Sequence, residues 1–270
     1  MKNEREEWYD AEKKVAVTIV DATEAVQSLC RGHLSGPVAG YYLAKACAAA
    51  ALLAAETSEK DETLIVQMKC KGPLGGLNVE CTAEGTLRGY TEKKTLDDFD
   101  GMGEPDDRKV IGERQFQITR SVPGRIISQG ISNSLDGYLA GSLQRKACIY
   151  LAASVTDDVE VVAAKGVMVE ALPDSNWTAF PDNATGRRAK GAVADRRLDI
   201  SVASRNILKQ LGLDKAELKK TTPLKFACRC SSDRAVAMLA ALSAEEKASL
   251  PETIDITCHM CGRIFTVKTR

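Results

Sequence analysis

The sequence lacks an excess of charge of either sign, and this absence argues against two classes of partner. Its 270 residues carry 37 Lys and Arg against 37 Asp and Glu. A neutral chain produces no overall field that would attract nucleic acid or an anionic membrane, so we expect neither as a partner. Apolar residues make up 44% of the chain and charged residues 27%, which is typical of globular proteins.

Long apolar runs are also missing. A membrane-spanning helix needs roughly 18 or more apolar residues, and the nearest candidate, 46–55, is short and rich in alanine. The first residues are polar and acidic and lack the apolar centre of a secretory signal. The glycine-rich segment 71–76 lacks the Gly-Lys-Ser/Thr of a phosphate-binding loop. We therefore expect a cytoplasmic protein that uses no nucleotide.

The cysteines are distributed unevenly along the chain. Four of the nine form two close pairs near the C-terminus, Cys228-x-Cys230 and Cys258-x-x-Cys261. Two short chelating pairs separated by a small insert have the spacing of a four-thiolate zinc site, because each pair spans one edge of the ligand tetrahedron. Gly262 follows the last cysteine and suits a tight turn. The pattern predicts one Zn²⁺ per chain.

Two other interpretations of these four cysteines are structural disulfides and buried apolar side chains. Structural disulfides are rare in a reducing compartment, where thiols stay reduced. Cysteines that only fill space in an apolar core would not be expected to cluster in two close pairs. The remaining cysteines show no pattern: Cys30, Cys47, Cys70, Cys81 and Cys148. Of these, Cys47 lies in an alanine-rich segment that predicts a helix, so we expect it to be a small core residue.

The apolar pattern predicts an α+β fold. Residues 1–172 alternate helices with mostly antiparallel strands. They include a helix from a Ser35 cap to residue 56, and three strands in succession over 62–91. An acidic, glycine-bearing loop is expected over 95–109.

A shift to Pro, Gly and Asn marks the start of a linker, which we place at 173–222. Residues 196–212 predict a helix with two apolar stripes, which is either buried on both sides or docked between two bodies. The capping-box pattern at 214–217 predicts a second, shorter helix. Residues 223–270 form the predicted zinc-binding module, with a helix capped at Ser243 and a terminal hairpin.

Several stretches together resemble the heat shock protein 33 family of redox-regulated holdase chaperones. In the tail these are 226–231 (FACRCS) and 254–262 (IDITCHMCG). Nearer the start they are 71–80 (KGPLGGLNVE) and 85–90 (GTLRGY), the latter matching an R-G-Y motif of the family. The resemblance extends over most of the chain, and the cysteine array is its most specific part. The acidic loop at 95–109 does not resemble the family's usual connection.

The resemblance implies an ATP-independent chaperone with no catalytic residue. Zinc would be held by the thiolates of Cys228, Cys230, Cys258 and Cys261 in an inactive reduced state. Oxidative stress would form the disulfides Cys228–Cys230 and Cys258–Cys261, release zinc and unfold the linker. Residues 1–172 would then bind unfolding client proteins, and the oxidised chain would form a homodimer.

Two alternatives from other functional classes remain. A thiol–disulfide oxidoreductase would use the pair Cys258 and Cys261, although such a pair normally opens a helix in a thioredoxin-like fold. A zinc ribbon that binds nucleic acid would use the basic and aromatic side chains of the tail, among them Arg263, Phe265 and Lys268.

Overall fold

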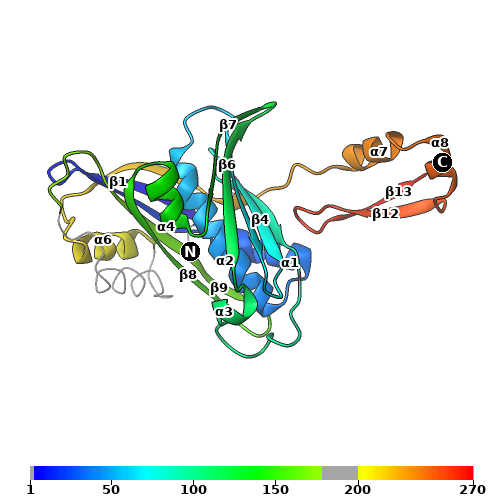
Figure 1. Cartoon of the computed structure of the whole chain (residues 1–270), viewed down its shortest axis with the longest axis horizontal. Helices are drawn as coiled ribbons and strands as arrows, with labels where there is room; N and C mark the ends of the chain where they lie inside the picture. Colours follow the sequence, from blue (N-terminus) through cyan, green and yellow to red (C-terminus); the bar gives the residue numbers. More distant parts are fainter. Residues whose placement is uncertain (1–2, 178–199, 270) are drawn as a thin grey trace.

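Two mainly antiparallel sheets enclose a central helix in the computed structural model, which describes residues 3–177 and 200–269 (Figure 1). Sheet A has the order β10 (Glu217–Pro223), β1 (Glu4–Asp10), β2 (Val15–Asp21), β9 (Val161–Ala171), β8 (Lys146–Val155). Sheet B has the order β11 (Lys225–Phe226), β5 (Thr86–Thr91), β4 (Gly76–Thr82), β3 (Thr63–Cys70), β6 (Arg114–Val122), β7 (Arg125–Ser132). All neighbouring strands are antiparallel except β11 and β5. The α+β prediction is confirmed, and β3 to β5 form the predicted succession of strands.

The helices are mostly short. They are α1 (Thr23–His33), α2 (Pro37–Leu53), η1 (Ala54–Glu56), α3 (Asp107–Val110), α4 (Leu135–Gly137), η2 (Tyr138–Ser142), α6 (Ile200–Gln210), α7 (Ser232–Ala240) and α8 (Ala244–Ala248). We call sheets A and B together with α1, α2 and α6 the two-sheet body.

Helix α2 forms the centre of the two-sheet body. Its alanines favour the helix, and they let it pack closely against strands of both sheets. The segment Pro37–Glu56 is apolar enough to cross a membrane by composition, but 89% of its most apolar window is buried inside the protein. Cys47 lies on α2 and is fully buried, as predicted.

The cap predicted for α2 is wrong. Gly36, not Ser35, is the N-cap residue, and it has no side chain to accept a hydrogen bond. The carboxylate of Asp100 fills this role instead, accepting hydrogen bonds from the Val38 and Leu96 amides at 2.9 Å. The acidic loop therefore folds back to stabilise the start of the central helix.

The linker agrees with the prediction in one helix and differs in the other. Helix α6 confirms the helix predicted over 196–212, whose first residues, including Leu198 of the second apolar stripe, lie outside the described residues. The helix predicted from 214 is wrong, because residues 217–223 form β10 and pair with β1. The open edge of β1 offers a full set of backbone hydrogen bonds, and β-branched Thr221 and Thr222 suit a strand.

The C-terminal module comprises α7, α8 and sheet C, a hairpin of β12 (Thr253–Thr257) and β13 (Ile264–Lys268). The capping box predicted at Ser243 is confirmed. The core of this module is small, with Ala235, Leu239 and Val267 as its buried residues. In Figure 1 the module and α6 lie at opposite ends of the molecule.

Candidate metal centre

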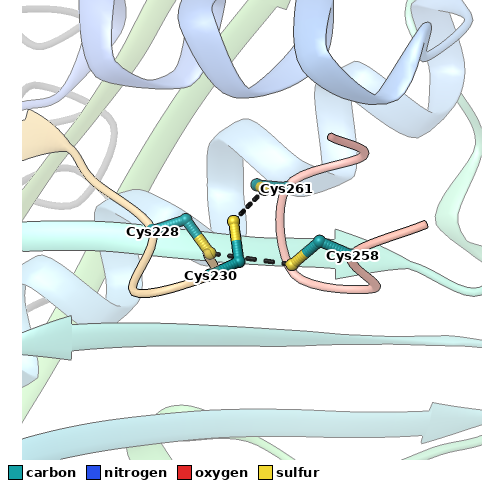
Figure 2. Close-up of side chains that lie close together, drawn as sticks. All are labelled: Cys228, Cys230, Cys258 and Cys261. Carbon is teal, nitrogen blue, oxygen red and sulfur yellow. Dashed lines mark hydrogen bonds between the residues drawn. The ribbon is translucent and has the colours of Figure 1, made fainter. Parts of the chain in front are cut away.

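The four tail cysteines come together where the C-terminal module meets sheet B. Cys228 and Cys230 follow β11, and Cys258 and Cys261 lie in the turn between β12 and β13 (Figure 2). All four Sγ atoms lie within 4.8 Å of one another. The Sγ atoms of Cys228 and Cys258 are 3.7 Å apart, and those of Cys230 and Cys261 are 3.5 Å apart. All four are free thiols in this structure.

Backbone hydrogen bonds shape the turn that presents Cys258 and Cys261. The amide of Cys258 donates to the Arg263 carbonyl at 2.8 Å, and the amide of Gly262 donates to the Cys258 carbonyl at 2.9 Å. Gly262 has a φ of 74°, a conformation that disfavours residues with a Cβ. This agrees with the tight turn expected at Gly262.

The separations between the sulfurs fit a tetrahedral metal site. In four-thiolate zinc sites the sulfurs lie about 2.3 Å from the ion, which places them roughly 3.8 Å from one another. The two measured separations are close to this value, and the sulfurs come from two chelating pairs as the spacing predicts. The cluster can therefore hold a metal ion.

Three of the four thiols have shifted pKa values, and the shifts differ in direction. Partial burial raises the pKa of Cys228, but hydrogen bonds from the Cys230 backbone and the neighbouring side chains outweigh it and bring the pKa to about 7. Burial raises the pKa of Cys230 and, more strongly, that of Cys261. Cys228 is therefore the first of these three to become a thiolate, and a bound cation would favour the thiolate form of all four.

The sequence profile of a family described as "Hsp33 protein" matches residues 7–268. The chain belongs to the Hsp33 family. A protein named 33 kDa chaperonin from Synechococcus sp. (strain JA-3-3Ab) is 27% identical over 273 residues, covering 95% of this chain and 84% of that protein. The 33 kDa chaperonin of Lacticaseibacillus paracasei is 29% identical over 265 residues, with 91% and 88% of the two chains covered.

The fold of this Hsp33-family chain is shared with a solved structure. The 33 kDa chaperonin (heat shock protein 33 homolog) of Thermotoga maritima superposes with a TM-score of 0.80 at 18% identity, over 100% of this chain and 96% of the other. At this identity the likeness concerns the fold alone. The Hsp33 family is a chaperone family, as the names of its curated members show, so this chain belongs to a chaperone family. Its cysteine cluster is compatible with metal binding.

The cysteines outside the cluster are mostly buried in the two-sheet body. Burial raises the pKa of Cys30 and of Cys81 to about 12 and that of Cys148 to about 11. Burial also raises the pKa of Cys47 well above its usual value. Such thiols carry almost no thiolate at neutral pH and react slowly with oxidants. Cys228, whose pKa is lowered to about 7, is therefore more reactive than these four thiols.

Residues of the two-sheet body that hold the cluster in place were not predicted from the sequence. The amide of Gly89 donates to the Met260 carbonyl at 3.1 Å, and Nε2 of His33 lies 2.8 Å from the Gly89 carbonyl. The rings of Tyr90 and His259 meet edge to face, with their centroids 4.0 Å apart. The R-G-Y motif identified these positions only as part of a resemblance, and strand pairing alone gave no sign that they touch the tail.

Proposed function

We propose that this chain is a redox-regulated, ATP-independent holdase chaperone whose reduced state holds one Zn²⁺ on Cys228, Cys230, Cys258 and Cys261. The single observation that carries the proposal is the convergence of these four thiols at the base of a module with very little core of its own. A soft, tetrahedral set of four sulfurs favours zinc over hard cations such as Mg²⁺ or Ca²⁺.

The size of the C-terminal module explains why loss of the metal would unfold it. Three buried apolar side chains, Ala235, Leu239 and Val267, cannot offset the conformational entropy of ordering about forty residues. A bound zinc ion supplies folding free energy on the order of 10 kcal/mol in such modules. Without it, we expect α7, α8 and the hairpin to unfold.

The linker covers an apolar face of sheet A. Ile207, Leu208, Leu211 and Leu213 are buried against a cluster that includes Trp8 of β1 and, from other strands, Val17, Cys148, Val167 and Val169. The guanidinium of Arg205 also lies over the Trp8 ring, 5.9 Å from its centroid. If α6 leaves, this face becomes a contiguous apolar surface that can hold unfolding proteins.

The segment between α6 and the cysteines connects the two ends of the molecule. Strand β10 pairs with β1 in sheet A, and β11 then pairs with β5 in sheet B just before Cys228. Buried Arg5 secures β10, because it donates to Thr222 Oγ1 at 3.4 Å and to the Ala51 carbonyl of α2 at 3.2 Å. A change at the cysteines can therefore reach α6 through one continuous stretch of chain.

Oxidation is proposed to pair Cys228 with Cys230 and Cys258 with Cys261. In each pair one thiolate attacks a molecule of hydrogen peroxide, the O–O bond breaks to give a sulfenic acid, and hydroxide leaves. The second thiolate attacks that sulfur, a disulfide forms, and hydroxide leaves, so each pair loses two electrons to one peroxide. The sulfurs of a disulfide are poor donors to a metal, so the four cysteines release it.

The other functional expectations are part of the same proposal. The chain is proposed to act without catalysis in the cytoplasm, to bind unfolding clients, and to form a homodimer when oxidised. Nucleic acid and membrane are not expected as partners. We keep the division into a client-binding domain (1–172), a linker (173–222) and a redox-switch domain (223–270).

The proposal is tested by comparing two forms of the full chain. Reduced, zinc-loaded protein is divided, and one portion is treated with hydrogen peroxide under mild heat. Zinc release is followed with a chromogenic chelator, and chaperone activity is followed by light scattering of a thermally unfolding client. We expect the oxidised portion to release its zinc and suppress aggregation while the reduced portion does neither. Equal activity of the two portions would contradict the proposal.

A further inference from the structure

An arginine of sheet B lies against the cysteine cluster. Nη1 of Arg88, in β5, approaches Cys228 Sγ at 4.0 Å. Its other nitrogens bind Glu80 of β4, with Nε at 2.7 Å and Nη2 at 2.6 Å from the carboxylate. Arg229, which stands between the first two cysteines, donates to the same carboxylate at 3.2 Å. Glu80 thus joins an arginine of the two-sheet body to one of the module.

The pair of Arg88 and Glu80 is well shielded from water, whereas the Arg229 side chain is more exposed. The side chains of Arg88 and Glu80 are only 17% and 15% exposed. Charges held in such surroundings interact more strongly than exposed pairs, because less water and salt screens them. The two hydrogen bonds to Glu80 fix the direction of the guanidinium, which leaves Nη1 facing Cys228.

The residues next to Arg88 complete a contact surface. Gly89 donates its amide to Met260, and the Tyr90 ring packs on His259. On the other side, a Cβ placed on Gly32 of α1 would lie 2.6 Å from the Cys261 carbonyl, which shows how closely the turn approaches the body. The backbone contact of Gly89 and the ring contact of Tyr90 do not depend on the charge of the cysteine sulfurs. The contact between the Arg88 guanidinium and Cys228 does depend on it.

Four thiolates around a divalent ion carry a formal charge of about −2, and disulfides or neutral thiols carry none. We propose that Arg88, oriented by Glu80, is a positioning residue that ties the charged cysteine centre to sheet B. The module then stays docked while its sulfurs are metal-bound thiolates, and it loses this attraction when they are not. The inference rests on the proposed function for the metal-bound state, and adds the contact that transmits this state to the two-sheet body.

The test uses the full chain, reduced and loaded with zinc, without client or oxidant. Arg88→Met keeps the length of the side chain and removes its charge, and Glu80 retains Arg229 as a partner. The matched control is Arg125→Met, which removes an exposed arginine of β7 that pairs with Glu59 at 2.9 Å, away from the cysteines. Bound zinc is measured in all proteins and is expected to stay at one per chain.

The readout is hydrogen exchange at the amides that cross the contact. The Gly89 amide binds the Met260 carbonyl, and the Ala227 amide binds the Leu87 carbonyl at 3.1 Å. We expect Arg88→Met to speed exchange at Gly89 about tenfold, in line with the loss of one charge-assisted contact, and Arg125→Met to leave it unchanged. After zinc removal with EDTA, exchange at Gly89 should be equally fast in the wild type and in Arg88→Met.

Unchanged exchange at Gly89 in zinc-loaded Arg88→Met would refute the tether. A difference between wild type and variant that persists after EDTA would also refute it, because Arg88 would then act on the sheet itself. If Arg88→Met loosens the centre of sheet B, at β3 and β6, Arg88→Lys decides. If Arg88 ties the cysteine centre to sheet B through its charge, the lysine should restore protection of the Gly89 amide. Restored protection at β3 and β6 without protection at Gly89 would refute the proposal. None of these outcomes depends on client binding, so the chaperone proposal stands or fails separately.

Discussion

Leu213→Ala should activate the reduced protein by loosening the linker without touching a cysteine. Leu213 follows α6, is fully buried, and packs in the apolar cluster under sheet A with Ile207 and Trp8. Leucine-to-alanine changes in well-packed cores cost about 2–5 kcal/mol, and the complete burial here places the expected loss near the middle of that range. Docking of a single linker helix is a local equilibrium of similar size, so this loss would expose part of the sheet A face.

The assay is light scattering of a thermally unfolding client with reduced, zinc-loaded protein. Leu213→Ala is expected to suppress aggregation before any oxidation, while its zinc content stays at one per chain. The matched control is Leu218→Ala in β10, because Leu218 is the same residue type in the same linker but is 46% exposed. The control should remain inactive until it is oxidised.

The reasoning would be refuted if reduced Leu213→Ala, shown to unfold at a lower denaturant concentration than wild type, still failed to hold the client. That outcome would mean that the face under α6 is not where clients bind. Chaperone activity in Leu218→Ala as large as in Leu213→Ala would also count against it, because activity would then follow from substitution in the linker and not from burial.

Three further predictions concern single residues. Cys258→Ser should lower bound zinc far below one per chain in a chelator titration, whereas Cys70→Ser should leave it unchanged; equal zinc contents would contradict the ligand assignment. Gly262→Ala should cost more unfolding free energy than Gly103→Ala in urea titrations, although both have positive φ, because a Cβ at Gly262 would overlap a backbone oxygen of α1 and one at Gly103 meets nothing within 4 Å. Burial acts to raise the pKa of Glu62, but its arginine partner and two backbone amides lower it below 4.5 overall. The stability that Glu62 contributes is therefore present above pH 4.5 and lost as pH falls through its folded pKa, so the advantage of wild type over Glu62→Gln should shrink there; a constant difference would exclude the linkage.

The cysteine cluster was accessible from the sequence because its signal is local. Chelating pairs such as Cys258-x-x-Cys261 must be close in sequence to span one edge of a tetrahedron, so spacing alone identifies them. Helix α2 and strands β3 to β5 were equally readable, since alanine content and alternation act within a few residues. That these cysteines bind zinc and form disulfides remains a prediction.

The errors and omissions share a physical cause, which is that distant partners override local preference. The pattern at 214–217 has the form of a helix start, but the unpaired edge of β1 recruits the following residues as β10. Ser35 has the chemistry of a cap, but the carboxylate that caps α2 belongs to Asp100. This residue lies 64 positions after the N-cap residue Gly36 in the sequence. Arg88 and Glu80 look like an ordinary cross-strand pair until Cys228 is placed beside them.

The pairing of β10 and β11 sets how far unfolding should travel from the cysteines. Strand β11 is only two residues long and forms an edge of sheet B, so it has little stability of its own once the module beside it unfolds. Strand β10 pairs with β1 along most of its length and is held by buried Arg5. Separating β10 from β1 therefore costs much more free energy than releasing the short edge strand β11. Loss of the metal alone should therefore free the chain back to about Leu224, and release of α6 requires a second contribution, such as heat or a competing client. This separates zinc release from exposure of the apolar face, and it explains why the two have to be measured independently.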